Sequence, residues 1–593
     1  MTEQQIEIVR AIEEELACSS RQRRFRVLSA VRQPGVIQIN VQRLTDGGDL
    51  DRDLEGGVAA WRDWASPVVE VSVEEGLVYV HQIDAPAPAP GMEIRVTPPR
   101  FLEALLQCWK NEEFAAECFS WAAHALVGRD RCPLVLSPSL PGLRERQQAA
   151  YSLLSYRAGF LWGPPGTGKT TTAAAMVADL IISDTNARVL LIAPTNSAVD
   201  QLLTAVDDRL SRSLKGQLAK TDCARIGSKF LARYYEGRRH LLPEATDELL
   251  LRKAHLEATQ PDAGAPQARA QWELEMNRVL AALRSQVQAV LKEKRVVAMT
   301  ATLGTMHYGL LRESEAFDLI VFDEASQLGR AVSLMLAPLA RRALIAGDPR
   351  QLAPIVKANR PFVHRWFGRT LFDEYMHDGH PTTCLLNEQS RMAVEICGLV
   401  SKMFYRGELR VSQQCFLDDN WCATRQPLYL SSSSGIHNLH LVEIGTESVP
   451  DAKSHRRLES AQAAVAIAQE LGTRIDHRSI LILTPFNAQK KLIRKELDAR
   501  GMRKTRVSTV HAAQGAEIHT VIFDPVKGNS FFLRDSNNGP RLLNVAISRT
   551  QACFVLLASN GDLKHPLLSA IADYIRGVAA PAVAPPTPPL ATD

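Results

Sequence analysis

The pattern of apolar and polar positions changes character three times along the 593-residue chain. Near the start, Ile6, Val9, Ile12 and Leu16 recur with helical spacing. The next stretches, among them FRVLSAV, GVIQINVQRL and EIRVT, alternate apolar and polar residues as half-buried strands do. After Pro98–Pro99 the helical period returns. This order predicts a helix over 1–23, a small β-domain over 24–98 and a stalk helix over 99–128.

From Gly159 onward the pattern is typical of an α/β protein. Short, continuously apolar runs alternate with helical segments: RVLLIAPT, FDLIVFDE, RALIAGD, SILILTP, TVIFD and CFVLLAS. Two parallel sheets can hold these strands, in domains over 129–375 and 376–577. A stretch at about 203–294 is too long for a plain connection and is rich in Leu, Ala, Arg and Glu, which predicts a helical insertion. The Pro/Ala-rich tail, 578–593, is predicted to be extended and disordered.

Composition narrows the picture only a little. Apolar residues make up 46% of the chain, and the formal net charge of +4 neither supports nor excludes a nucleic-acid partner, which needs only local positive charge. The ten cysteines show no zinc-type spacing, and no apolar run approaches membrane-spanning length. We therefore expect a soluble, intracellular, cytoplasmic protein without a membrane partner.

The segment FLWGPPGTGKTT (160–171) is the first with a definite chemistry. It matches the phosphate-binding loop G-x-x-x-x-G-K-[ST] after a strand and before a helix. Backbone N–H groups of such a loop surround phosphate, Lys169 reaches the β/γ oxygens, and the Thr170 hydroxyl can ligate Mg²⁺. The predicted nucleotide-binding residues are Gly163, Pro164, Pro165, Gly166, Thr167, Gly168, Lys169, Thr170 and Thr171.

Two carboxylates at a strand end complement this loop. Asp323 and Glu324 in VFDEASQ follow four apolar residues, which places them at the carboxyl end of a buried strand. Asp323 would hold Mg²⁺ through water, and Glu324 would orient and deprotonate the attacking water. Alone, such a pair could also be a different metal site or a solvated loop end; together with the loop it favours nucleotide hydrolysis.

Nine motifs in order resemble superfamily 1 helicases of the Upf-like group, named for the helicase of nonsense-mediated decay. The resemblance runs from Leu143 to Ser559 and comprises LRERQQAA, the phosphate loop, LLIAPTNSAVDQLL, DEASQ, LIAGDPRQLAPIV, LLNEQSRM, ILTPFNAQ, VSTVHAAQGAEIHTVIFD and LLNVAISRT. It implies an α/β fold of two RecA-like parallel-sheet domains, with a β-barrel-like accessory domain and a helical insertion. It also implies ATP and Mg²⁺ as the nucleotide and the metal.

The resemblance assigns roles to further nucleotide-site residues. Gln147 resembles the glutamine that pairs with the adenine edge, and Gln351 resembles the sensor of the γ-phosphate. Glu517 resembles the ribose-binding acid. Arg391 and Arg549, from the second domain, resemble arginines that stabilise the transferring phosphoryl group. The residues expected to be catalytic are thus Lys169, Glu324, Gln351, Arg391 and Arg549.

The resemblance also implies a partner. The positions at which the family contacts nucleic acid correspond here to Thr195, Asn196, Thr484, Pro485 and His511. Such contacts suit binding of phosphates without readout of the bases. ATP-driven closure of the two domains would then move the protein along single-stranded DNA or RNA, in the 5′→3′ direction by family likeness alone. DNA and RNA stay open, as does a protein partner for the accessory domains; a monomer is favoured. The rival hypotheses are an ATP-gated clamp or remodeller that unwinds little, and a P-loop signalling switch.

One position departs from the family pattern. NEQSRM has Ser390 where the group usually has a tyrosine that packs on adenine. Serine cannot stack, so the sequence predicts relaxed nucleotide selectivity with appreciable use of GTP.

Overall fold

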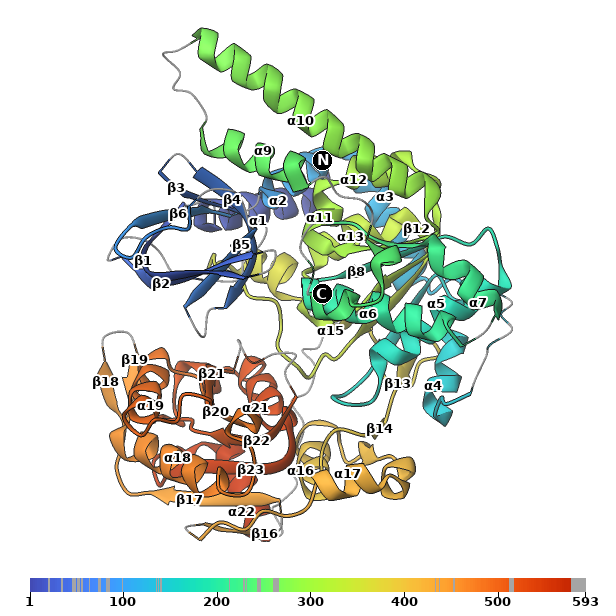
Figure 1. Ribbon diagram of the computed structural model, residues 1–593. Coiled ribbons are helices and arrows are strands. Elements are labelled where there is room, and N and C mark those ends of the chain that lie inside the picture. Colours follow the sequence, from blue (N-terminus) through green and yellow to red (C-terminus); the bar gives the residue numbers. More distant parts are fainter. Residues whose placement is uncertain are drawn as a thin grey trace. The chain divides into compact units, whose positions relative to one another are not determined.

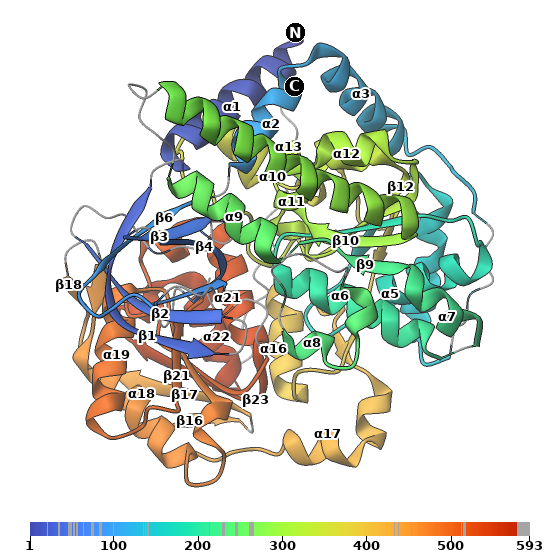
Figure 2. The ribbon, with the colours of Figure 1, turned by 45° about the horizontal axis from the view of Figure 1, so that its top comes forward.

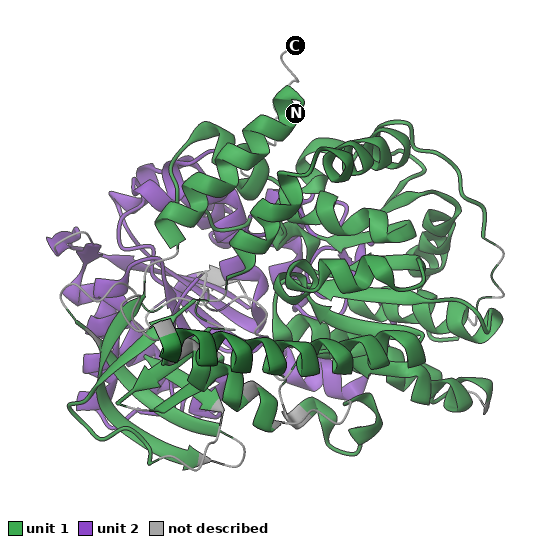
Figure 3. Cartoon of the chain, turned by 90° about the horizontal axis from the view of Figure 1, so that it is seen from above, with its two compact units in different colours: residues 1–161, 169–347, 354–384 green, residues 162–168, 348–353, 385–593 purple. Residues whose placement is uncertain are grey.

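The computed structural model divides into two compact units, coloured separately in Figure 3. Unit 1 comprises residues 1–161, 169–347 and 354–384, and unit 2 comprises residues 162–168, 348–353 and 385–593. The structure describes residues 1–577 except 20–21, 34–35, 45–49, 51–53, 55–56, 63, 73–75, 82–85, 99, 135, 137, 139–140, 213, 228–229, 231, 243–246, 260–265, 432, 437, 452–453, 511–512 and 514–516. The predicted disordered tail, 578–593, and His511 therefore lie outside the described residues.

A closed six-stranded barrel opens unit 1 (Figure 1). Its antiparallel strands follow the order β1-β2-β5-β4-β3-β6. In β6, Ile94 and Val96 are fully buried, whereas Glu93 and Arg95 are exposed, so alternation divides inside from outside. The predicted barrel is confirmed. The strands are β1 (Arg23–Gln33), β2 (Val36–Arg43), β3 (Val58–Trp61), β4 (Trp64–Ser72), β5 (Leu77–His81) and β6 (Glu93–Thr97).

Helices flank the barrel in sequence: α1 (Glu3–Ser19), α2 (Phe101–Trp109) and α3 (Glu112–Ala122). α1 packs on α2, and Gln5 Nε2 donates to the Trp109 carbonyl at 2.9 Å. The buried face of α1 includes Ile8 and Ile12, but Ile6 is 45% exposed. The buried face of α1 is therefore rotated relative to the apolar face that the sequence spacing predicts.

A seven-stranded sheet forms the centre of unit 1, in the order β13-β7-β12-β11-β8-β10-β9. β8 pairs in parallel with β10 and β11, and β11 with β12. Every residue of β7 and β8 is buried, as expected for parallel strands covered on both faces. The strands are β7 (Ala158–Trp162), β8 (Val189–Ala193), β9 (Cys223–Arg225), β10 (Val296–Thr300), β11 (Phe317–Phe322), β12 (Ala340–Gly347) and β13 (Thr383–Leu385).

The helices of unit 1 around this sheet precede its first strand or connect its strands. The longer ones are α5 (Lys169–Ser183), α6 (Asn196–Leu210) and α13 (Arg330–Leu336). The shorter ones are α4 (Glu145–Ala149), α7 (Leu214–Ala219), α8 (Ala232–Tyr235), α11 (Ala301–Met306), α12 (Tyr308–Glu313), α14 (Pro361–Val363) and α15 (Leu371–Tyr375).

The stretch predicted as a helical insertion contains two long helices, α9 (Asp247–Ala258) and α10 (Pro266–Glu293). α9 packs against strands β3 and β4 (Figure 2). Leu251 of α9 packs against the apolar core of the barrel. Leu256, Met276 and Val279 form a separate small core between the two helices. The same stretch also supplies β9, which pairs in parallel with β10 and so belongs to the central sheet.

Unit 2 is built on a six-stranded sheet in the order β16-β17-β23-β22-β20-β21, parallel except for β16. Both predicted RecA-like sheets are therefore confirmed. The strands are β16 (Ser434–Ile436), β17 (Leu439–Ile444), β20 (Ile480–Thr484), β21 (Arg506–Thr509), β22 (Ile518–Phe523) and β23 (Thr550–Ser559). The helices are α16 (Val394–Phe404), α17 (Asp419–Thr424), α18 (Leu458–Leu471), α19 (Asn487–Ala499), α20 (Phe531–Arg534), α21 (Asn538–Ser548) and α22 (Pro566–Ile575).

Two small strand pairs complete unit 2. β14 (Glu388–Gln389) pairs with β15 (Arg410–Val411), and β18 (Val449–Asp451) pairs with β19 (Ser454–Arg456). Among the residues that the structure describes, no helix is long and apolar enough to cross a membrane.

Candidate nucleotide and nucleic-acid sites

The phosphate loop lies between the end of β7 and the start of α5 at Lys169. Gly166 and Gly168 have φ angles of +75° and +81°, a region that side chains with a Cβ rarely adopt. A Cβ on Gly166 would also lie 2.7 Å from the Cβ of Arg391. The glycines at these positions are therefore required by the backbone path of the loop.

The loop's hydroxyl and the strand-end carboxylate meet in unit 1. Thr170 Oγ1 donates to Asp323 Oδ2 at 2.9 Å, and Asp323 is 1% exposed. Burial, and then the negative charge of Glu324, raises the pKa of Asp323 to about 6, although Lys169 and Thr170 act in the opposite direction. A buried carboxylate with a raised pKa favours a cation beside it, because a cation offsets the lost hydration.

Glu324 has an unusual backbone for a residue other than glycine. Its φ and ψ are 50° and 37°, in the left-handed region, which costs about 1–3 kcal/mol. Its N–H donates to Asp323 Oδ1 at 3.0 Å, and Gln327 Nε2 donates to its Oε2 at 3.3 Å. The local fold thus holds the Glu324 carboxylate by a hydrogen bond from a residue of the same turn.

In unit 2, Gln351 and Arg549 are directly linked. Arg549 Nη2 donates to Gln351 Oε1 at 2.8 Å, and both residues are buried. Gln351 Nε2 donates in turn to Asp348 Oδ2 at 3.0 Å. Asp348 also accepts from Trp162 Nε1 at 3.1 Å and from the Tyr405 hydroxyl at 2.6 Å. The predicted sensor and arginine therefore share a buried polar network, and Asp348, Trp162 and Tyr405 are members that sequence reasoning missed.

Arg391 and Glu517 form an ion pair in unit 2. Arg391 Nη1 also donates to the Ser548 carbonyl at 3.2 Å. Burial alone would raise the pKa of Glu517, but the charges of Arg391 and Arg549 outweigh it and lower the pKa below its usual value. Glu517 is thus held as a carboxylate next to the predicted arginine.

The segment around α17 binds the backbone of the NEQSRM motif, which contains Ser390 and Arg391. Trp421 Nε1 donates to the Ser390 carbonyl at 2.6 Å. Arg425 Nε and Nη2 both donate to the Arg391 carbonyl, at 3.1 and 3.0 Å, and the guanidinium lies 5.0 Å from the centre of the Trp421 ring. Sequence reasoning missed Trp421 and Arg425, since contacts to backbone carbonyls leave no pattern in the sequence.

The nucleic-acid residues predicted in unit 1 lie where β8 leads into α6. Thr195 caps α6 and accepts the Ala198 N–H at 3.2 Å. Asn196 Oδ1 accepts from Arg225 Nη2 at 2.8 Å. Arg225, at the end of β9, is fully buried and pairs through Nε with Asp200 Oδ1 at 3.1 Å. Arg225 therefore fixes the orientation of the Asn196 amide and was missed from sequence.

Of the counterparts predicted in unit 2, Thr484 and Pro485 lie where β20 leads into α19. Thr484 is fully buried, and its Oγ1 accepts the Phe486 N–H at 3.3 Å. The hydroxyl thus stabilises the turn that contains Pro485.

Gln147, the predicted adenine partner in unit 1, is 5% exposed, and its Oε1 accepts the Arg144 N–H at 2.9 Å at the start of α4.

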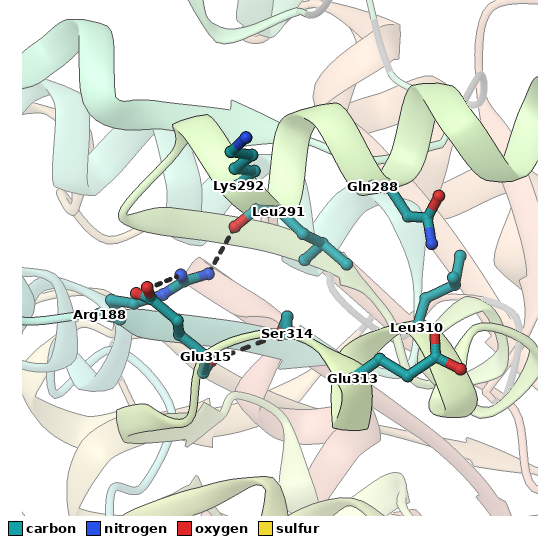
Figure 4. A pocket seen from close by; sticks show the side chains of 8 residues that line it. All are labelled: Arg188, Gln288, Leu291, Lys292, Leu310, Glu313, Ser314 and Glu315. Atoms are coloured by element: carbon teal, nitrogen blue, oxygen red, sulfur yellow. Dashed lines mark hydrogen bonds and ion pairs between the residues drawn. The ribbon is translucent and has the colours of Figure 1, made fainter.

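A separate hollow of about 280 Å³ lies in unit 1 (Figure 4). Arg188 in its wall donates to the Leu291 carbonyl at 2.6 Å and pairs with Glu315 at 3.2 Å. Because Arg188 directly precedes β8, the hollow lies at the amino-terminal edge of the sheet, opposite Asp323. It is therefore distinct from the nucleotide residues.

Comparison with known proteins finds family models that match the segments containing the two sheets. Two family models, each described as an AAA domain, match residues 143–270 with 244–359 and residues 367–561. ATP-dependent helicase upf1 of Schizosaccharomyces pombe is 25% identical over 481 residues, or 76% of this chain. ATP-dependent helicase NAM7 of Saccharomyces cerevisiae is 25% identical over 73% of this chain. The chain belongs to the Upf-like superfamily 1 helicases.

This Upf-like chain is shorter than several of its relatives. It spans 49% of the S. pombe upf1 protein and 43% of NAM7. It spans 68% of another relative, the DNA polymerase alpha-associated DNA helicase A of S. pombe, at 23% identity over 74% of this chain. A solved arterivirus helicase, nonstructural protein 10, aligns with 92% of this chain and 80% of its own at a TM-score of 0.39 and 10% identity.

The residues of this Upf-like helicase fit Mg²⁺ and a nucleoside triphosphate. Magnesium prefers oxygen ligands and is usually held by one or two protein groups together with water and phosphate. The Thr170 hydroxyl and the buried Asp323 carboxylate supply two such oxygens 2.9 Å apart. Lys169 lies close enough to lower the pKa of Asp323 by its charge. The donor set therefore fits Mg²⁺.

Proposed function

We propose that this protein is a Mg²⁺-dependent ATP hydrolase that moves along single-stranded nucleic acid and separates duplexes, in the 5′→3′ direction. The observation that carries the proposal is the meeting of Thr170 with the buried Asp323, next to Lys169 and Glu324. Membership in the Upf-like group supports nucleic acid as the partner.

Four residues of unit 1 would perform the hydrolytic step. Lys169 binds the β/γ oxygens of ATP, and Thr170 and Asp323 would hold Mg²⁺, directly and through water. When bound, the ion neutralises charge that develops on the phosphate oxygens. Glu324 accepts a proton from the attacking water, and its hydrogen bond from Gln327 orients its carboxylate for that role.

Arg391 and Arg549 of unit 2 would act on the transferring phosphoryl group. Arg549 is fixed by Gln351, and Arg391 is fixed by Glu517 and the Ser548 carbonyl. Prearranged guanidinium groups stabilise the transition state without having to reorganise. We propose that ATP engages both units and draws them together, and that hydrolysis releases them.

Nucleic acid would follow the residues that begin α6 and α19. Thr195 and Asn196 would contact its phosphates from unit 1, and Thr484, Pro485 and His511 would contact them from unit 2. Such contacts hold the strand without reading its bases, so we propose that the protein accepts many sequences. DNA and RNA both stay open as the partner, as does a protein partner for the barrel. A monomeric state and a cytoplasmic location stay predictions of the sequence.

Steady-state hydrolysis with and without matched single-stranded DNA and RNA oligomers tests the proposal. We expect several-fold stimulation by at least one oligomer, and loss of all hydrolysis in Lys169→Ala. A P-loop signalling switch, by contrast, would hydrolyse at the same rate whether or not a strand is present.

A further inference from the structure

Two segments of unit 2 leave the sheet at the same edge. β20 and β22 are parallel neighbours, with Leu483 opposite Phe523. The Asp524 N–H donates to the Leu483 carbonyl at 2.8 Å, so the pairing continues to the strand ends. The segment that follows β22 and leads to α20 therefore emerges beside Thr484 and Pro485, where the proposed function puts the strand backbone.

An aromatic row, His455–Phe486–Phe532–Phe531, lines this edge. Phe486 directly follows Pro485, and its ring centre lies 5.4 Å from that of His455 and 5.3 Å from that of Phe532. The Phe532 and Phe531 rings are 5.5 Å apart. Within the row Phe486 is buried, at 6% exposed, whereas Phe531 at one end is 78% exposed.

The exposed end of the row is anchored by its neighbours. Leu533 is 2% exposed, and its N–H donates to the Ser530 carbonyl at 3.1 Å, while its own carbonyl lies 3.1 Å from His565 Nε2. Phe532 is held by its contact with Phe486. The backbone on one side of Phe531 is therefore fixed, and the fold leaves a large apolar ring exposed to solvent.

A positive charge accompanies the row. Lys527 Nζ lies 3.3 Å from His455 Nε2. Burial, and then the charge of Lys527, lowers the pKa of His455, which favours the neutral ring beside the ammonium group. The nearby carboxylate of Asp524 is fully buried and paired with Arg457, so it does not oppose an anion at the surface.

We propose that Phe531 stacks on a base of the single strand whose backbone is held at Thr484–Pro485, while Lys527 neutralises a phosphate of the same strand. An exposed ring beside a cation is the combination by which single-strand sites hold nucleic acid, because every base offers a face for stacking. The inference rests on the proposed function and adds a base contact to a site otherwise made of phosphate contacts.

Binding of a dye-labelled single-stranded oligomer, measured by anisotropy, tests the inference. Phe531→Ala is expected to weaken binding about 5- to 150-fold, the range for loss of one stacked base, and Phe531→Tyr to retain it. The same oligomer with abasic residues keeps the phosphates but offers no face for stacking, so native protein and Phe531→Ala should bind it equally. Tyr429→Ala is the matched control, since Tyr429 is an aromatic residue of unit 2 that is 70% exposed.

Any other binding result would refute either the stacking contact of Phe531 or the proposed function. Equal binding of the normal oligomer by native protein and Phe531→Ala would refute the stacking contact. An equal loss on normal and abasic oligomers would also refute it, because the ring would then act through the fold, the phosphates or a different kind of partner. Failure of the native protein to bind either oligomer would instead overturn the proposed function.

Discussion

Replacing Arg225 by methionine should loosen the start of α6. Arg225 and Asp200 are 1% and 0% exposed, so the substitution leaves a buried carboxylate without its charged partner. The Tyr235 hydroxyl still donates to Asp200 at 2.7 Å, but it carries no charge. Removing one partner of a buried pair costs about 3–5 kcal/mol.

Hydrogen exchange measures this cost locally. A loss of about 3–5 kcal/mol corresponds to an acceleration of about two to three and a half orders of magnitude for amides that exchange through local opening. We expect this change in β9 and in the first turns of α6. Asp208→Asn is the matched control: Asp208 lies on the same helix, is 58% exposed and pairs with Arg238, so its loss should change exchange very little.

The double variant Arg225→Met/Asp200→Asn separates stability from function. It removes both charges and leaves an amide oxygen for Tyr235, so protection should return to within about tenfold of native, or 1.4 kcal/mol. Asn196 would still lack its donor Arg225, so affinity for a single strand should stay up to about tenfold weaker. Native exchange in Arg225→Met, or native strand affinity in the double variant, would refute the reasoning.

Three further substitutions test the nucleotide site. Glu324→Gln should keep ATP binding but stop hydrolysis, because an amide cannot accept the water's proton; turnover at the native rate would remove Glu324 as the base. Arg549→Ala should lower kcat by about 10³-fold or more with little change in nucleotide affinity, and equal losses in both would assign Arg549 a binding role. The native enzyme should use GTP appreciably, and Ser390→Tyr should shift kcat/KM toward ATP; a strong native preference for ATP that tyrosine leaves unchanged would contradict the expected effect of Ser390.

The strands of the two central sheets and the phosphate loop were predictable because their sequence patterns involve residues that are close together in the chain. Continuous apolar runs belong to strands buried on both faces, and polar residues that follow such runs reach the carboxyl edge of the sheet. That logic predicts Thr170 and Asp323 as ligands of one metal ion, and in the structure the Thr170 hydroxyl donates to Asp323. The domain boundaries and most assigned roles stay predictions, since they rest on likeness to the family.

The residues that were missed act over long sequence separations or through the backbone. β9 has only three residues, too few to show a period, so its place in the sheet was hidden inside a helical stretch. Arg225 is a buried charge, whereas arginine is normally expected at the surface. Trp421 and Arg425 bind backbone carbonyls more than 30 residues earlier in the chain, and any residue type can offer such a carbonyl.

Strand displacement from a duplex with one single-stranded tail tests the central claim most directly. With ATP and Mg²⁺, native protein should release the strand from a 5′-tailed duplex but not from a 3′-tailed duplex. The Glu324→Gln variant should release the strand from neither duplex. Strand-stimulated hydrolysis without release from either duplex would contradict the claim and identify an ATP-gated clamp or remodeller instead.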